Sequence, residues 1–131
     1  MNLHRATELQ GSLNGTRILL VEDEVLIAVE LKMSLEEAGA TVTHAQRQEK
    51  AVTLARETAF DAAILDVNLG RNTTCEPVAQ ILQDRGVPFL LHTGDYRVAG
   101  DLVERIGAPV AHKPIASSRI IEMLATMLKP A

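Results

Sequence analysis

Aromatic residues and cysteine are scarce in this chain. Its 131 residues include no Trp, one Tyr, two Phe and one Cys. A single Cys excludes an internal disulfide and is typical of a reducing compartment, so we expect a cytoplasmic protein. Because no nearby Cys or His completes a metal or redox site, we interpret Cys75 as chemically inert.

Long hydrophobic runs and an excess of basic charge are also missing. No apolar run approaches the ~18 residues that a membrane-spanning helix needs, and residues 1–15 lack the apolar core of a signal peptide. Thirteen basic against seventeen acidic residues give a net charge of −4, with no block of like charge. This composition argues against a basic nucleic-acid-binding surface, and we expect neither a membrane nor a nucleic acid as a direct partner.

Five short apolar runs recur along the chain and are typical of β-strands. They are residues 17–21, 40–45, 62–66, 87–92 and 108–112. Segments with the helical spacing of apolar residues lie between and after them, the clearest at residues 120–128. Gly39, Gly86 and Gly107 stand where helices commonly end.

The regular alternation of strand and helix indicates an α/β fold. Parallel strands joined by helical crossovers form a sheet that helices cover on both faces. We therefore predict one (βα)5 doubly wound domain over residues 16–131, preceded by a flexible segment at residues 1–15. Pro109 falls in the fifth run and favours an edge position for that strand, because Pro cannot donate a ladder hydrogen bond.

Polar side chains gather where these strands end. They are Glu22 and Asp23 after the first strand, Asp66 at the end of the third, Thr93 after the fourth and Lys113 after the fifth. Ligands of doubly wound sheets bind at the carboxyl ends of the strands, so these side chains should converge. Three carboxylates within ~4 Å repel one another unless they take up protons or a cation. Oxygen ligands without His or Cys favour Mg²⁺, and a phosphoryl group would add further oxygens beside Lys113 and Thr93.

The same residues resemble the receiver domains of two-component response regulators. The resemblance rests on VEDE at 21–24, LDVNL at 65–69, HTG at 92–94 and HKP at 112–114, in that order. It covers about residues 16–129. Each motif is common by itself, and their joint order at strand ends is what makes the resemblance specific.

The resemblance implies a parallel five-stranded sheet of order 2-1-3-4-5, as in flavodoxin-like and receiver folds. It implies that Asp66 is the phosphoacceptor. It further implies that Asp23 binds Mg²⁺ directly, Glu22 through water and Asn68 through its backbone carbonyl.

Around this acidic site, the resemblance implies that Thr93 and Lys113 hold the phosphoryl oxygens. The Lys113-Pro114 peptide is expected to be cis, which costs an X-Pro bond only ~0.5–1 kcal/mol. His92 and His112 flank these positions without ligand spacing, and we interpret both as packing or rim residues.

The implied function is signalling and not enzymatic turnover. A sensor histidine kinase would donate the phosphoryl group, and a downstream protein or a phosphotransfer protein would respond. No output domain follows residue 129, so we expect a single-domain regulator that switches protein contacts or relays phosphoryl groups. Pairing of two copies through the helices beside the fifth strand is a further expectation.

Two positions depart from the family pattern. Most receivers carry Phe or Tyr three residues before the site lysine, where this chain has Val110. Tyr96, three residues beyond Thr93, resembles the Phe-Ala-Thr-Gly-x-Tyr motif of a receiver subset that lacks that aromatic. We therefore predict Tyr96 as the switch residue, with residues 93–98 repositioned on phosphorylation; the alternative is that Tyr96 only caps the helix surface.

Three other functions stay open from the sequence alone. A dehalogenase-like phosphohydrolase also uses an Asp at a strand end, but it needs a second acid where Asn68 stands. A flavodoxin-type flavin carrier needs a phosphate loop rich in Ser, Thr and Gly, whereas this chain has EDEV at 22–25. A receiver-like binding module that is never phosphorylated differs only in its chemistry, so labelling with a small phosphodonor distinguishes it.

Overall fold

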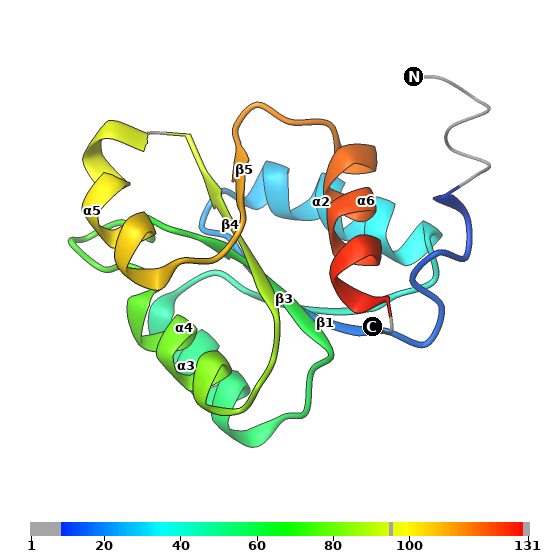
Figure 1. The fold of residues 1–131 in the computed structure, drawn as a ribbon, viewed down its shortest axis with the longest axis horizontal. Helices are drawn as coiled ribbons and strands as arrows, with labels where there is room; N and C mark the ends of the chain where they lie inside the picture. The colour runs from blue at the N-terminus through cyan, green and yellow to red at the C-terminus, as the bar shows by residue number, and fades with distance from the viewer. Residues whose placement is uncertain (1–8, 95, 130–131) are drawn as a thin grey trace.

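The structure is a computed structural model that describes residues 9–94 and 96–129 (Figure 1). Within these residues five strands alternate with five helices. The strands are β1 Arg17–Val21, β2 Thr41–Ala45, β3 Ala62–Asp66, β4 Phe89–Thr93 and β5 Val110–His112. The helices are α2 Val25–Glu37, α3 Gln48–Glu57, α4 Glu76–Asp84, α5 Tyr96–Ile106 and α6 Ser117–Leu128. None of the described helices is long and apolar enough to cross a membrane.

The five strands form one parallel sheet in the order β2-β1-β3-β4-β5. Helices α2 and α6 cover one face, and α3, α4 and α5 cover the other (Figure 1). The predicted (βα)5 doubly wound fold and its strand order are therefore confirmed. Strand β5 lies at an edge of the sheet, as Pro109 indicated.

The central strands are apolar because both of their faces are covered. Every residue of β3 and of β4 is buried. Alternate side chains point to opposite faces: Ile64 and Leu90 pack toward α2 and α6, while Leu65 and Leu91 pack toward α3, α4 and α5. Each fully buried Leu or Ile contributes roughly 1.5–3 kcal/mol of transfer free energy. The sheet is therefore a firm support for the residues that follow its strands.

Strands β4 and β5 each begin two residues later than the apolar runs predicted. Strands β4 and β5 start at Phe89 and Val110, directly after Pro88 and Pro109. Proline has no N–H to donate, so the ladder cannot include it as a donor. The carbonyls of both prolines still accept a hydrogen bond from the neighbouring strand. Ala63 N–H donates to the Pro88 carbonyl at 3.1 Å, and Leu91 N–H donates to the Pro109 carbonyl at 2.8 Å.

The segment before β1 is packed where the structure describes it. Residues 1–8 of the predicted flexible segment lie outside the described residues, but Leu13 is 1% exposed and belongs to the core beneath α2 and α6. Its N–H donates to the Ala38 carbonyl at 2.9 Å. The packed part of the chain thus begins before residue 16. A single Leu among polar residues has no periodicity, so the sequence pattern gave no sign of this contact.

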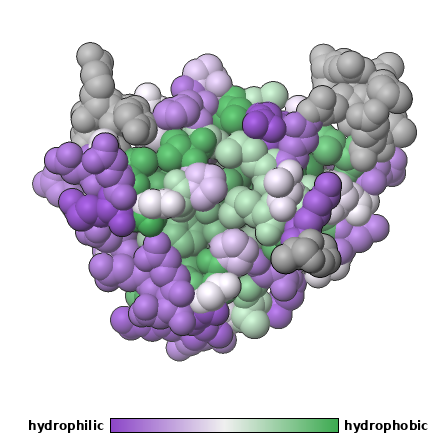
Figure 2. All heavy atoms as spheres, in the orientation of Figure 1, coloured by the Kyte–Doolittle hydropathy of each residue, from purple (hydrophilic) through white to green (hydrophobic). Residues whose placement is uncertain are grey.

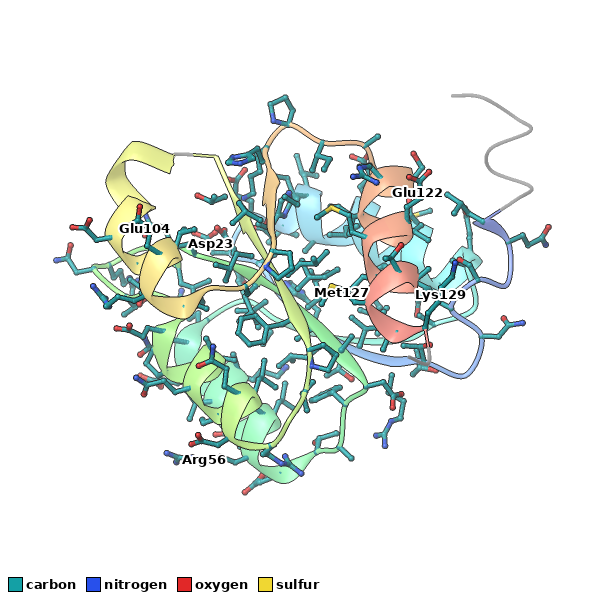
Figure 3. The ribbon with its side chains drawn as sticks, viewed as in Figure 1. Asp23, Arg56, Glu104, Glu122, Met127 and Lys129 are labelled. Carbon is teal, nitrogen blue, oxygen red and sulfur yellow. The ribbon has the colours of Figure 1, made fainter. Side chains whose placement is uncertain are left out.

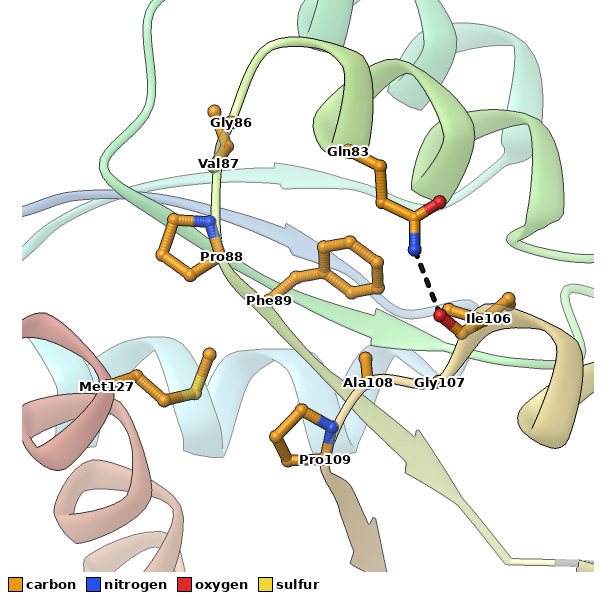
Figure 4. Close-up of a pocket in the computed structure, with 10 residues that line it drawn as sticks. All are labelled: Gln83, Gly86, Val87, Pro88, Phe89, Ile106, Gly107, Ala108, Pro109 and Met127. Carbon is orange, nitrogen blue, oxygen red and sulfur yellow. Dashed lines mark hydrogen bonds between the residues drawn. The ribbon is translucent and has the colours of Figure 1, made fainter.

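The face seen in Figure 1 is apolar at its centre and polar around it (Figure 2). Here a hollow of about 340 Å³ opens at the amino ends of β4 and β5, between Pro88, Pro109 and Met127 (Figure 4). Gln83 closes one side by donating its Nε2–H to the Ile106 carbonyl at 2.9 Å. Among the described residues, no titratable side chain lines this hollow.

Gly39 provides a test of how closely the N-terminal segment is packed. Its φ is +104°, and a Cβ there would overlap the Asn14 side chain and stand 2.9 Å from the Asn14 Cα. We expect Gly39→Ala to lower the free energy of unfolding by about 3 kcal/mol or more, since backbone strain and a clash with main chain add together.

Gly86 is the matched control for this substitution. Its φ is +71°, but a Cβ there would meet nothing within 4 Å, so Gly86→Ala should cost only about 1–2 kcal/mol. Urea denaturation of both variants measures the difference. Equal losses in the two variants would show that the segment before residue 16 is not packed on the domain.

Candidate functional site

Five of the predicted site residues line one cavity at the carboxyl ends of the strands, and the buried Glu22 lies beside it. The cavity has a volume of about 750 Å³ and is lined by Asp23, Asp66, Asn68, Thr93 and Lys113, among others. Asp23 lies at this edge, well apart from Arg56 near the end of α3 (Figure 3). Thr93 is 4% exposed where β4 ends. The parallel sheet thus assembles residues that are far apart in sequence.

Three acids form the centre of the site. Glu22, Asp23 and Asp66 each offer one carboxylate oxygen, and these oxygens lie within 4.8 Å of one another. Glu22 is fully buried, and Asp66 is 5% exposed. The pairing of Val21 with Leu65 places Glu22 next to Asp66 across the neighbouring strands. Register therefore fixes the proximity of the two buried acids.

The main chain holds Glu22 in place after β1. Its N–H donates to the Ala45 carbonyl at 3.1 Å, and its own carbonyl accepts from His44 Nε2 at 2.8 Å. One side-chain oxygen, Oε2, accepts from the Glu24 N–H at 3.3 Å. The other, Oε1, accepts no hydrogen bond within the described residues. A buried carboxylate oxygen left in this way is costly, and a cation is its natural partner.

Lys113 supplies the nearest positive charge. Its Nζ lies 3.0 Å from Glu22 Oε1, 3.4 Å from Asp66 Oδ2 and 3.6 Å from Glu24 Oε1. The contact with Glu22 is an ion pair by distance, without the alignment of a hydrogen bond. Burial lowers the pKa of Lys113, but the charges of Asp66 and Glu22 outweigh it and raise that pKa above 10.5. The ammonium therefore stays charged beside the acids.

One ammonium does not compensate three acids, and Asp66 retains a proton. Burial raises the pKa of Asp66, and hydrogen bonds with Glu22 and Asp23 raise it further, from an ordinary value of 3.8 to about 9. Burial alone would raise the pKa of Glu22, but Asp66 and Lys113 hold it below its ordinary value. Without a cation, the proton shared by this pair therefore resides on Asp66 at neutral pH.

The donor set fits Mg²⁺. The ligands of the ion would be carboxylate oxygens of Asp23 and Asp66, with the carboxylate of the buried Glu22 next to them. This cluster contains no His or Cys. Hard divalent cations prefer such oxygens, and Mg²⁺ commonly uses one or two carboxylates while keeping water molecules. The exposed side of the cavity leaves room for these waters and for an anionic group.

The loop after β3 gives the cavity its outer wall. Asn68 pairs with Thr74 in an isolated antiparallel bridge, flanked by the hydrogen bond from Cys75 N–H to the Val67 carbonyl at 3.0 Å. Asn68 Oδ1 accepts from the Gly70 N–H at 3.3 Å. Gly70, Arg71 and Asn72 all have positive φ, so this turn reverses sharply beside the site. The predicted ligand role of the Asn68 carbonyl stays a prediction.

Other sequence-based expectations fall around this centre. The Lys113-Pro114 peptide is cis, as expected. Cys75 is fully buried, and burial raises the pKa of its thiol to about 12, which supports an inert role. Tyr96 begins α5, but its side chain lies outside the described residues. Val110 begins β5 and is half-buried.

His92 is the residue whose importance the sequence did not indicate. It is 4% exposed, and its Nδ1 lies 3.7 Å from Glu22 Oε1. Burial and the charge of Lys113 lower its pKa to about 4, although Glu22 opposes the shift. It is thus a buried neutral residue within the site, whereas His112 is exposed, as expected for a rim residue.

Comparisons with known proteins agree with this geometry. Residues 18–125 match the family described as "Response regulator receiver domain". The chain is 37% identical over 79 residues to the alginate biosynthesis transcriptional regulatory protein AlgB of Pseudomonas syringae pv. tomato, which covers 60% of the chain and 16% of AlgB. It is 29% identical over 80 residues to the transcriptional regulatory protein ResD of Bacillus subtilis, covering 61% of the chain and 33% of ResD. The chain thus spans only a part of these relatives.

Solved structures share the whole fold. The non-phosphorylated HemR receiver domain from Leptospira biflexa superposes with a TM-score of 0.76 at 28% identity, over 88% of this chain and 96% of that one. A CheY-like receiver domain protein from Methanospirillum hungatei JF-1 gives a TM-score of 0.78 at 23% identity, over 86% and 93% of the two chains. The second likeness concerns the fold alone.

The raised pKa of Asp66 predicts how stability changes with pH. Below about pH 6.5 the lowered pKa of His92 opposes the effect of Asp66, but between about pH 6.5 and pH 9 the folded protein holds the Asp66 proton that the unfolded chain has lost, so the free energy of unfolding falls as the pH rises. With a chelator present, Asp66→Asn should flatten this decline and raise stability at pH 8 by about 1–3 kcal/mol. Asp84→Asn, an exposed acid on α4, should keep the wild-type slope.

Urea denaturation of the three proteins at pH 7 and 8.5 provides the measurement. A wild-type protein whose stability rises over this range would show that Asp66 is ionised when folded. An Asp84→Asn variant that flattens the slope as much as Asp66→Asn would assign the effect to general surface charge.

Proposed function

The chain belongs to the response regulator receiver domain family, and we propose that it accepts a phosphoryl group on Asp66 from a sensor histidine kinase. The modified form would then alter contacts with a downstream protein or pass the group to a phosphotransfer protein, in the cytoplasm. One observation carries this proposal. A strand-end carboxylate, Asp66, stands with two further acids inside 4.8 Å and with an ammonium 3.4 Å from its Oδ2.

The transfer step follows from the chemistry of these groups. A carboxylate oxygen of Asp66 forms an O–P bond while the P–N bond of a phosphohistidine, or the P–O bond of an acyl phosphate, breaks. The leaving imidazole or carboxylate takes the bonding electron pair. Asp66 must first lose its proton, and a cation among the acids favours that loss by lowering its pKa.

The surrounding residues would bind and orient the incoming group. Lys113 Nζ, already within ion-pair distance of Asp66, would neutralise phosphoryl oxygens. The Thr93 hydroxyl, at the end of the adjacent strand, would donate a hydrogen bond to them. Mg²⁺, when held by Asp23 and Asp66 with Glu22 and the Asn68 carbonyl, would add positive charge against the same oxygens. Positioning and charge stabilisation are what phosphoryl transfer requires.

An exposed apolar stripe beside the site supports a protein as phosphodonor. Val25, Leu26, Val29 and Met33 lie on one side of α2 and are 51–85% exposed. Helix α2 begins immediately after Asp23 and Glu24, so a partner seated on this stripe would border the acids. Exposed apolar side chains grouped in this way are typical of protein contact surfaces. A second copy of the chain is an alternative occupant of this stripe, distinct from the pairing expected through the helices beside β5.

A phosphohydrolase and an unphosphorylated binding module remain the alternatives. The hydrolase would need a general acid two residues beyond Asp66, and that position holds Asn68, whose Oδ1 accepts from the Gly70 N–H. An amide cannot shuttle a proton in the way that a carboxyl does. The unphosphorylated module would need no nucleophile, which leaves the buried Asp66 without a use.

Labelling at Asp66 tests the proposal directly. Incubation with acetyl phosphate and millimolar Mg²⁺ should add one phosphoryl group, detected by intact-protein mass spectrometry, and Asp66→Asn or a chelator should abolish it. Asp101→Asn alters an exposed acid that lines the same cavity and should label like the wild type. Persistent labelling of Asp66→Asn would contradict the assignment, and an unlabelled wild type would favour the binding module.

The switch is a separate part of the proposal. Val110 offers neither a polar tip nor a large ring, so we expect residues 93–98 to carry the change through Tyr96. Tyr96→Ala should be phosphorylated at the wild-type rate but lose most of the phosphorylation-dependent amide shifts in that segment, measured by NMR. Val110→Ala should keep them. The reverse result would place the switch in β5.

A further inference from the structure

Two buried polar atoms of the acidic site lie close together without a hydrogen bond between them. Glu22 Oε1 and His92 Nδ1 form no hydrogen bond within the described residues, and they lie 3.7 Å apart. Glu22 is 0% exposed and His92 is 4% exposed, so bulk water does not satisfy them. Buried polar atoms without partners are uncommon and cost about 1–3 kcal/mol each. Glu22 Oε1 has the ammonium of Lys113 at 3.0 Å, whereas His92 Nδ1 has no partner within hydrogen-bond distance among the described residues, which indicates a contact that forms in another state of the site.

The sheet register brings His92 to this position. His92 pairs with Asp66 across β4 and β3, and Glu22 follows Val21, the partner of Leu65. Glu22, Asp66 and His92 thus form a row across three strands. Each of the three follows by two positions a residue that packs toward α2 and α6, namely Leu20, Ile64 and Leu90. Since residues two apart in a strand point to the same side, all three lie on one face of the sheet. Only small main-chain shifts are possible in such a row.

Lys113 explains why the contact is not yet made. Its Nζ lies 3.0 Å from Glu22 Oε1 and 3.4 Å from Asp66 Oδ2, so one ammonium serves two acids. A Mg²⁺ ion among the acids would repel this ammonium, and a phosphoryl group on Asp66 would draw it toward Asp66, so either would leave Oε1 without its cation. A buried anion that loses its partner is strongly destabilised unless another donor replaces it.

His92 is equipped to be that donor. A neutral imidazole carries a single N–H, on either Nδ1 or Nε2. If that proton is on Nδ1, a closure of less than 1 Å brings it into hydrogen-bond distance of Oε1. No change of protonation state is required, only a choice of tautomer.

We propose that His92 is a positioning residue of the acidic site, which donates its Nδ1–H to Glu22 Oε1 and fixes that carboxylate when Lys113 moves away from it. The oriented carboxylate would keep Oε2 on the Glu24 N–H and present a fixed negative charge to the cation site. Partners that orient a metal-binding group in this way commonly contribute 10–100-fold to metal affinity. The role of Lys113 in this inference rests on the proposed function.

Mg²⁺ binding by three proteins tests the inference. Wild type, His92→Asn and His92→Leu are titrated with MgCl2 alone by isothermal calorimetry. Asn places an N–H donor near the position of Nδ1, whereas Leu fills similar space without one. We expect His92→Leu to bind Mg²⁺ about tenfold more weakly and His92→Asn to stay within about threefold of the wild type. Equal affinity of the Leu variant and the wild type would overturn the role of His92.

The tautomer is measured independently on the wild-type protein. Long-range ¹⁵N–¹H NMR spectra should show the His92 proton on Nδ1 in the Mg²⁺-bound protein. A proton on Nε2 would overturn the inference even if the Leu variant failed to fold. Acetyl phosphate labelling separates the two proposals. If the wild type binds Mg²⁺ and is labelled, and His92→Leu binds Mg²⁺ with the same affinity, only the role of His92 is refuted. A wild type that neither binds Mg²⁺ nor is labelled refutes both.

Discussion

Repulsion among carboxylates at the ends of β1 and β3 is the constraint on which the rest of the site depends. Glu22 and Asp66 are buried next to each other because the strand register leaves them no other place. The sheet below them is packed on both faces and cannot move them apart. The repulsion must therefore be compensated locally, by the proton on Asp66 and by the ammonium of Lys113.

Both forms of compensation are replaceable, and this makes the site responsive. A cation can displace the proton, and an anionic group on Asp66 can attract the ammonium away from Glu22. A hydrophobic pair of the same volume would be at least as stable but would respond to neither. Burying these acids costs stability, but their burial makes the structure sensitive to a single added charge. This is consistent with a site that has to change state.

The sequence predicted the parts of this structure that follow from periodicity and from the topology of parallel sheets. Strands β1 and β3 match the predicted runs, because in each an uninterrupted apolar stretch leads up to a carboxylate, Glu22 directly after β1 and Asp66 at the end of β3. The convergence of Asp66 with Lys113, which are distant in sequence, also followed, because parallel strands end at the same edge. What these arguments could not provide was any contact that depends on side-chain direction.

Three features show that limit. Leu13 packs against the α2–α6 core, although no periodic pattern in the sequence predicts this contact. The stripe from Val25 to Met33 has the spacing of a buried helix face but is exposed, because Ala28, Leu31 and Leu35 on another side of α2 meet the sheet. His92 has the burial of a packing residue, as the sequence suggested, yet its neighbour is a carboxylate. Periodicity identifies which positions are apolar or buried, and not what each one touches.

The same packing decides where a change at Asp66 can travel. Strands β3 and β4 are buried throughout, and Ala111 in β5 is 1% exposed, so displacing them would disrupt both cores. The loops above them are less constrained: residues 70–72 have positive φ, and Gly94 is exposed beside Lys113. Switching segments are drawn from such regions of low local stability. A charge added to Asp66 should therefore move the loops after β3 and β4, and with them the start of α5, while the sheet stays fixed.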